Sequence, residues 1–209
     1  MRGKGVDQEQ RKGLIDKHRN SFERHGYSPN TLYWVSRGVQ KARFKVLAEI
    51  GVSSGDSLLD IGCGFADLNS WLLGHGVQVE YTGLDLSPEI AGKAASLHPE
   101  AEVLCGELFD FDWPPQSFDW VMLSGTLNWQ LNDDGDYARR VIHRMFELCR
   151  DGVAFNMLNL RHRDMKHMQD LVAFDPDEML AFCAQLTPDC RCRTDYMAND
   201  FTIYMQRVL

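Results

Sequence analysis

The chain of 209 residues lacks the features of several protein classes. No apolar run is long enough to cross a membrane as a helix, and residues 1–10 are polar and lack the apolar centre of a secretory signal peptide. There is no internal repeat, and with 44% apolar residues the composition is typical of one globular domain with a full core. We therefore expect a cytoplasmic protein without a membrane segment.

Cysteine occurs at six positions, but not in a pattern that binds a structural metal. No pair of Cys-x-x-Cys motifs is present, and Cys190 and Cys192, two residues apart, supply at most half of a zinc site. His162 and His167 are five residues apart, whereas a spacing of four brings two ligands to one helical face. The sequence predicts no metal site, and we interpret the cysteines as reduced thiols that pack as small apolar residues.

An excess of basic residues is also missing, because 22 Lys and Arg stand against 30 Asp and Glu, for a formal net charge of −8. Proteins that bind a nucleic-acid backbone usually carry a basic surface. Only residues 1–26 are basic, and we interpret them as a polar arm, partly helical or mobile, ahead of a single domain at 27–209. Nucleic acid is therefore disfavoured as a partner.

The strongest pattern in the chain is the stretch 58–73, LLDIGCGFADLNSWLL. An apolar run ends at Asp60, a turn follows at Gly62, Cys63 and Gly64, and the apolar residues after the turn recur at the helical period. This pattern predicts a strand, a tight turn and a helix, in which glycine lets a ligand approach the backbone closely.

Carboxylates near this stretch indicate the charge of the ligand. Asp85 follows the turn by about 20 residues, where a carboxylate binds the ribose hydroxyls of a nucleotide-like ligand. A dinucleotide would place its pyrophosphate at the N-terminus of the helix, where Asp67 would repel it. Asp60, Asp67 and Asp85 together favour a ligand that is nucleoside-like and cationic, and they disfavour an NAD-dependent enzyme.

The run 60–66, DIGCGFA, resembles motif I of the class I S-adenosylmethionine (SAM)-dependent methyltransferases, an acidic residue followed by G-x-G-x-G. Ala66 stands at the third glycine position, and the resemblance extends from about Thr31 to the C-terminus through several motifs in order. It implies a Rossmann-like α/β fold, a doubly wound, seven-stranded, mostly parallel sheet with an antiparallel C-terminal strand and helices on both faces. It also implies SAM as cofactor and S-adenosylhomocysteine (SAH) as product.

The periodicity and the caps place the elements of this fold. Besides the helix of the 58–73 stretch, we expect helices at 28–51, 87–98 and 137–150 and one that starts at 175. Strands are expected at 58–60, 81–85, 101–104, 118–123, 153–158, 191–197 and 201–208.

The resemblance also implies roles for single residues at the cofactor. The helix at 28–51 would cover the opening of the cofactor site, with Arg37 at the ligand carboxylate. Arg37 and Tyr33 could equally well be exposed residues of a surface helix with no role in binding. Glu107, just past the third strand, would accept a hydrogen bond from the adenine amino group, and Leu108 would lie against the ring. The cofactor-binding residues predicted in this way are Tyr33, Arg37, Asp60, Gly62, Cys63, Gly64, Asp85, Leu86, Gly106, Glu107, Leu108, Ser124 and Gly125.

The acceptor site is harder to predict. The sequence lacks the Asn/Asp-Pro-Pro-aromatic tetrapeptide that methylases of exocyclic and amide nitrogens carry after the fourth strand, which disfavours an adenine or glutamine acceptor. The predicted acceptor-binding residues are Trp34, Asn128, Trp129 and Arg161. Trp129 could instead pack under a loop and Arg161 could lie on a solvated loop. No catalytic residue is assigned, since His143 and His162 are candidate bases by residue type alone.

The resemblance predicts an enzyme that moves a methyl group from SAM to a nucleophilic atom of a small-molecule acceptor by in-line displacement. Two alternatives remain open: a SAM-binding regulatory protein without turnover and a nucleic-acid methyltransferase. The acceptor, the methylated atom and the choice between monomer and homodimer are left open.

Overall fold

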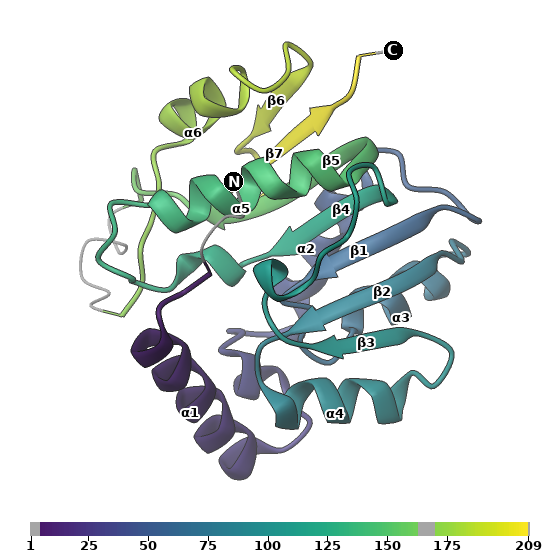
Figure 1. The fold of residues 1–209 in the computed structure, drawn as a ribbon, viewed down its shortest axis with the longest axis vertical. Coiled ribbons are helices and arrows are strands. Elements are labelled where there is room, and N and C mark those ends of the chain that lie inside the picture. Colours follow the sequence, from purple (N-terminus) through teal and green to yellow (C-terminus); the bar gives the residue numbers. More distant parts are fainter. Residues whose placement is uncertain (1–4, 163–169, 209) are drawn as a thin grey trace.

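A computed structural model of the protein describes residues 5–162 and 170–208, which form a seven-stranded sheet with helices on both faces (Figure 1). The strands are β1 (Ser57–Ile61), β2 (Glu80–Asp85), β3 (Glu102–Cys105), β4 (Phe118–Ser124), β5 (Cys149–Leu158), β6 (Cys190–Arg193) and β7 (Asp200–Gln206). Their order is β3-β2-β1-β4-β5-β7-β6, and β7 runs antiparallel to both of its neighbours. The predicted fold class is confirmed.

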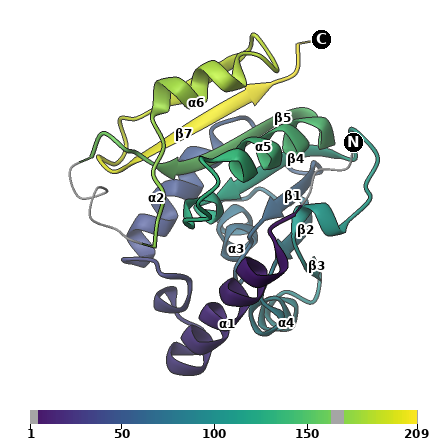
Figure 2. The ribbon, with the colours of Figure 1, turned by 60° about the vertical axis from the view of Figure 1, so that its left-hand side comes forward.

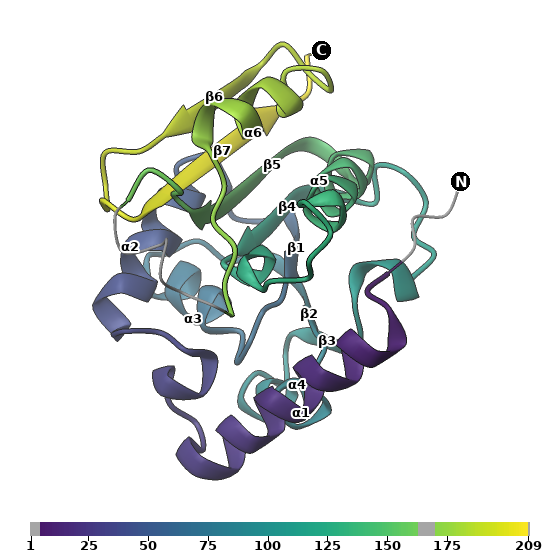
Figure 3. The same ribbon diagram turned by 90° about the vertical axis from the view of Figure 1, so that its left-hand side faces the viewer.

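Helices cover the sheet on both sides. They are α1 (Gln8–His25), α2 (Arg37–Ala48), α3 (Asp67–Gly74), α4 (Pro88–Leu97), α5 (Asp136–Leu148) and α6 (Pro176–Cys183). Figure 3 shows α2 and α3 on one side of the sheet and α5 on the other. None of the helices in the described ranges is both long and apolar enough to cross a membrane.

Alternating residues of the central strands build two cores. In β4, Val121 and Leu123 pack with the apolar residues of α5 and α6, whereas Trp120 and Met122 pack with those of α2, α3 and α4. All four side chains are buried. A strand that is apolar at nearly every position therefore lies between two layers of helices, as its sequence pattern predicts.

The helix expected at residues 28–51 is divided, which corrects the prediction. Ser28 caps a short 3-10 helix, Pro29–Leu32, which ends at Tyr33 in the left-handed conformation with φ 58°. A second cap follows, because the Ser36 hydroxyl accepts a hydrogen bond from Val39 N and starts α2 at Arg37. The helix expected at 137–150 also ends earlier, at Leu148, because β5 begins at the next residue.

The basic arm is largely one helix. The Asp7 carboxylate accepts hydrogen bonds from Glu9 N and Gln10 N and starts α1, and Gly26, with φ 59°, ends it. Only Ser21 is buried on this helix. α1 lies beside α4, as Figures 2 and 3 both show, and ion pairs hold it in place: Arg11 with Asp110, Lys17 with Asp170 and Arg19 with Glu89.

A buried ion pair joins α2 to β7. Arg43 Nε lies 2.5 Å from Asp200 Oδ2, and Nη2 lies 3.0 Å from Oδ1. The Asp200 side chain is fully buried and also accepts a hydrogen bond from the Tyr196 hydroxyl. Burial raises the pKa of Asp200 to about 6, against the effect of Arg43. Removal of one partner would leave the other charge buried and unpaired.

We expect Asp200→Ala to lower the free energy of unfolding by about 3–5 kcal/mol, because Arg43 loses its counter-ion in the core. Urea unfolding at a pH well above the pKa of Asp200 measures the loss. The matched control is Asp195→Ala, which removes an exposed partner of Arg193 and should cost less than about 1 kcal/mol. Equal losses in the two variants would contradict the structural role of the buried pair.

Candidate functional site

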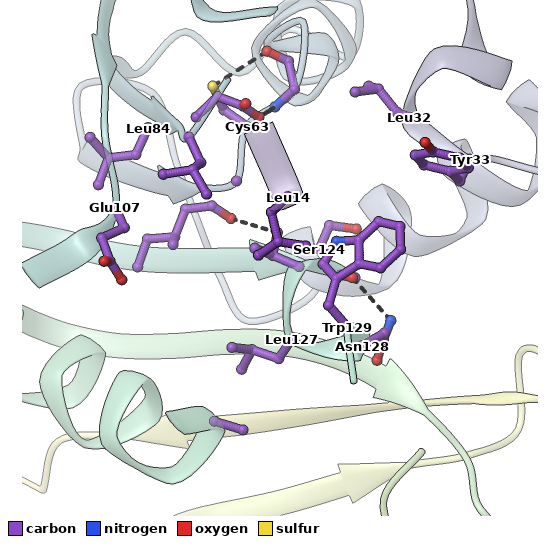
Figure 4. A pocket seen from close by; sticks show the side chains of 18 of the residues that line it. Leu14, Leu32, Tyr33, Cys63, Leu84, Glu107, Ser124, Leu127, Asn128 and Trp129 are labelled. Atoms are coloured by element: carbon purple, nitrogen blue, oxygen red, sulfur yellow. Dashed lines mark hydrogen bonds between the residues drawn. The ribbon is translucent and has the colours of Figure 1, made fainter. Parts of the chain in front are cut away.

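A cavity of about 250 Å³ lies at the carboxyl ends of β1 to β4 (Figure 4). The chain lays strands outward from β1 to β3 and then returns to place β4 on the other side of β1. Loops diverge at such a reversal of strand order, and open α/β sheets bind their ligands there. The cavity is also lined by Val6, Leu14 and His18, so the N-terminal part of the chain forms one of its walls.

The glycine turn after β1 has a backbone that only glycine tolerates well. Gly62 and Gly64 have φ values of 69° and 58°, and a Cβ on Gly62 would overlap the Thr126 side chain. A Cβ on Gly64 would lie 2.5 Å from Leu32 Cδ1. Ala66 also adopts the left-handed conformation, with φ 59°, immediately before α3. The turn therefore carries no side chain at Gly62 or Gly64, and its backbone forms part of the cavity wall.

Two carboxylates at neighbouring strand ends carry raised pKa values. Asp60 is buried and accepts a 2.6 Å hydrogen bond from the Tyr81 hydroxyl. Burial raises the pKa of Asp60 to about 7, with a further contribution from the charge of Asp85. Burial raises the pKa of Asp85 to about 6, although Ser87 N and Gly64 N donate hydrogen bonds to it at 2.9 and 3.0 Å. A cation in the cavity would favour the ionised form of both groups.

Glu107 is buried under the N-terminal segment. Val6 N donates to both of its carboxylate oxygens, at 3.1 and 3.2 Å, and the Tyr137 hydroxyl donates at 2.9 Å. Arg11 Nη1 lies 3.3 Å from Oε1, and Arg11 also forms a bidentate pair with Asp110. These contacts bring the segment before α1 to the end of β3.

The end of the cavity opposite Glu107 is aromatic (Figure 4). The rings of His18, Tyr33 and Trp129 meet edge to face, with centroid separations of 5.4–5.7 Å. We call these three residues the aromatic corner. Asn128 lies next to Trp129 in Figure 4. Its side-chain amide donates a hydrogen bond to Gly125 O and accepts one from Leu158 N, each at 3.1 Å. The cavity thus has an acidic end and an aromatic end.

The structure brings most of the predicted cofactor residues together. All of them line the cavity except Arg37. Arg37 is exposed on the first turn of α2, and its guanidinium lies 5.7 Å from the centroid of the Tyr27 ring. Asp67 does not line the cavity either. Its carboxylate accepts hydrogen bonds from the Tyr27 hydroxyl and the Gln40 side-chain amide. Their roles at the cofactor stay predictions.

The predicted acceptor residues divide in the same way. Trp34, Asn128 and Trp129 line the cavity. Arg161 does not, and it pairs instead with Asp175 and Asp177 on the surface.

The histidines considered as bases lie elsewhere. Neither His143 nor His162 is among the described residues that line the cavity. His143 is exposed on α5, next to Glu147. His167, which was considered as a metal ligand with His162, lies outside the described residues. In the described ranges, no cluster of three or more His, Cys, Asp or Glu side chains could hold a metal ion.

Sequence reasoning missed several residues that line the cavity, above all His18, Arg43 and Tyr137. Arg43 carried a signal, because a charged residue next to Phe44 on the apolar side of a helix must find a partner when it is buried. His18 carried none, since the arm around it is polar and weakly periodic.

Comparison with known proteins agrees with this geometry. Residues 58–152 match a family described as a methyltransferase domain. Rv1506c of Mycobacterium tuberculosis, a protein classed as a methyltransferase, is 28% identical over an alignment of 160 residues. The alignment covers 72% of this chain and 93% of that protein.

Two solved structures share the fold. The magnesium protoporphyrin IX methyltransferase of Synechocystis PCC 6803 with bound SAM has a TM-score of 0.68 at 14% identity, covering 99% of this chain and 100% of that one. A Haemonchus contortus phosphoethanolamine N-methyltransferase, in complex with phosphomonomethylethanolamine and SAH, has a TM-score of 0.62 at 16% identity, covering 84% and 46%.

The strand order, the thin glycine turn beside acidic strand ends and the family match over the same residues lead to one assignment. The protein is a methyltransferase with the class I fold, and its cofactor is SAM.

Proposed function

We propose that this enzyme methylates a small molecule held at the aromatic end of the cavity. The observation that carries the proposal is the position of α1, whose Leu14 and His18 line the cavity together with the strand ends. A helix across the site leaves room for a compact acceptor, whereas a polymer would have to displace it. The net charge of −8 further disfavours a nucleic acid.

Two of the related proteins are named for small substrates, magnesium protoporphyrin IX and phosphoethanolamine. Their likeness to this chain lies in the fold, so the names support the class of acceptor and not its identity.

The proposed cofactor contacts follow the acidic end of the cavity. Asp85 would bind the ribose hydroxyls, and Glu107 would accept a hydrogen bond from the adenine amino group beside Leu108. A carboxylate offers roughly four acceptor sites, and Val6, Arg11 and Tyr137 supply three donor groups, so Glu107 keeps room for about one more. The Gly62–Gly64 backbone and Ser124 would lie along the methionine part.

When bound, SAM supplies a methyl group on a positively charged sulfur. The chain would contribute mainly position, which can be worth roughly 7–11 kcal/mol when two reactants are held in line. The apolar rings of the aromatic corner would exclude water from the acceptor. Asp60 and Asp85 would supply negative charge at the cofactor end.

The affinity for SAM should rise with pH. Below pKa values of about 7 and 6, Asp60 and Asp85 bind protons, become neutral and no longer attract a cation. We expect the dissociation constant to fall roughly tenfold as the pH rises from about 5.5 to about 7.5, and to change little above that. Calorimetric titration at several pH values measures this.

SAH is the matched control ligand, because its sulfur is neutral, and its affinity should depend less on pH over the same range. An equal pH dependence for SAM and SAH, or an affinity for SAM that falls with pH, would contradict the electrostatic role of the two carboxylates.

Asp85→Ala should weaken SAM binding by at least about 1 kcal/mol, because a buried ligand hydroxyl loses a charged acceptor. Glu80→Ala is the matched control, since Glu80 is exposed at the opposite end of the same strand and should leave the affinity unchanged. Calorimetry gives both affinities. If the Asp85→Ala protein is folded and binds SAM as tightly as the wild type, Asp85 does not contact the ribose.

The class of acceptor can be tested with SAM labelled in its methyl group. We expect the label to enter compounds of low molecular mass when the enzyme is incubated with a metabolite extract. Total RNA from the same cells, incubated separately, should stay unlabelled. Labelling of the RNA would overturn the small-molecule assignment, and SAM binding without transfer to either fraction would favour a regulatory protein.

A further inference from the structure

The aromatic corner contains a polar group that has no partner within residues 5–162 and 170–208. His18 lies edge-on to the rings of Tyr33 and Trp129, with centroid distances of 5.7 and 5.6 Å. Its ring lines the cavity, and its Nδ1 is buried with no hydrogen-bond partner among the described residues. An unpaired buried nitrogen is unfavourable in the free protein. The nitrogen itself has almost no accessible surface in the free protein, so a ligand completes its hydrogen bond as the ring of His18 turns toward the cavity that the ring lines.

The other charged side chains of the cavity already have partners within the described part of the chain. Asp60 accepts from Tyr81, Asp85 from two backbone N–H groups, and Glu107 from Val6 and Tyr137. Asp133 caps α5, because its carboxylate accepts hydrogen bonds from Gly135 N and Tyr137 N. Arg43 is paired with Asp200. Among the described residues, His18 is therefore the ionisable side chain of the cavity that is available to bind the molecule to be methylated.

The surroundings of His18 keep its imidazole neutral. Burial lowers the pKa of His18 to about 4, and the charge of Lys17 lowers it further. Lys17 Nζ lies 4.2 Å from the centroid of the Trp129 ring and is paired with Asp170. The Tyr33 hydroxyl, which also faces this region, donates to Lys17 O. A neutral imidazole keeps one nitrogen lone pair that can accept a proton.

The same surroundings select the acceptor. Flat apolar molecules pack well against the edges and faces of aromatic rings. A cationic amine would meet the positive charge of Lys17 and would find no unpaired carboxylate among the described residues of the corner. A neutral ring with a polar substituent satisfies both the aromatic walls and the unpaired nitrogen.

We propose that the acceptor is a neutral, planar molecule with a hydroxyl group, in its simplest form a phenol, and that His18 accepts the hydrogen of that hydroxyl. This rests on the proposed small-molecule function. The acceptor oxygen forms a bond to the methyl carbon as the carbon–sulfur bond breaks, and that electron pair stays on sulfur to give SAH. The hydroxyl proton passes to His18 and then to water, so His18 acts as the general base.

A weak base is sufficient for this step. The oxygen becomes strongly acidic while its bond to the methyl group forms, so proton transfer late in the reaction needs little basicity. The neutral state of His18 is the property that the step requires, because a protonated imidazole has no free lone pair.

The test compares 2-naphthol with 2-methoxynaphthalene, which has the same rings but no hydroxyl hydrogen. Both are titrated calorimetrically into the SAH-bound enzyme. We expect the wild type to bind 2-naphthol at least about fivefold more tightly, and His18→Phe to bind the two compounds equally. His18→Gln, whose amide oxygen can still accept, should recover part of the preference. His143→Phe, on the exposed face of α5, is the matched control and should behave as the wild type.

A second readout does not depend on affinity. The ring nitrogen resonances of His18 in ¹⁵N NMR should shift on addition of 2-naphthol and stay in place with 2-methoxynaphthalene. Methylation of 2-naphthol should fall at least about a hundredfold in His18→Phe, the range that general bases contribute, while SAH binding is unchanged.

The outcomes separate the two proposals. If His18→Phe binds SAH normally and keeps the preference for 2-naphthol, the role of His18 is wrong while the methyltransferase function stands. If the enzyme binds 2-naphthylamine in preference to 2-naphthol, the hydroxyl class of acceptor is wrong. If small molecules are not methylated and RNA is, the proposed function fails, and this inference fails with it.

Discussion

The site depends on the parallel pairing of β1 with β2 on one side and β4 on the other. The register places Asp60 beside Gly83 and beside Met122, so the strands end at a common edge. Asp85 then stands close enough to Asp60 for its charge to raise the pKa of Asp60, which is buried. Two carboxylates held in this way are unfavourable unless a proton or a cation joins them. The negative charge that we propose for the cofactor end follows from how the sheet is assembled.

The N-terminal segment completes the cavity from outside the sheet. Val6 and Arg11 reach Glu107, about a hundred residues further along the chain, and Lys17 reaches Asp170. Through these contacts a helix with one buried residue brings His18 to the aromatic corner. The strand ends supply most of the residues expected at the cofactor, and α1 supplies His18 at the aromatic end of the cavity.

Local patterns in the sequence placed most of the elements, and the family resemblance implied how they form a sheet. A nearly continuous apolar strand, serine-proline caps and a glycine turn each leave a signal within a few residues, and the predicted sheet and the methyltransferase class are confirmed. The site was predictable where it follows the strand ends, since parallel strands deliver their last residues to one edge. Most predicted cofactor residues do line the cavity there, although their contacts with SAM remain predictions.

The errors have physical causes. Periodicity could not show that Ser36 would cap a second helix, or that the partner of the buried Arg43 would be Asp200. The partner of Arg43 lies far along the chain. The place of α1 depends on such partners even more, because Val6 and Glu107 are brought together only by the finished fold.

The attachment of α1 has a consequence for turnover. Its ion pairs with Asp110, Glu89 and Asp170 are partly exposed to solvent, so each contributes little and dissolved salt screens it. The contacts of Val6 and Arg11 with the buried Glu107 are screened less and hold the start of the helix. Ionic strength would then govern how firmly the rest of the helix covers the cavity, and with it the exchange of ligands between turnovers.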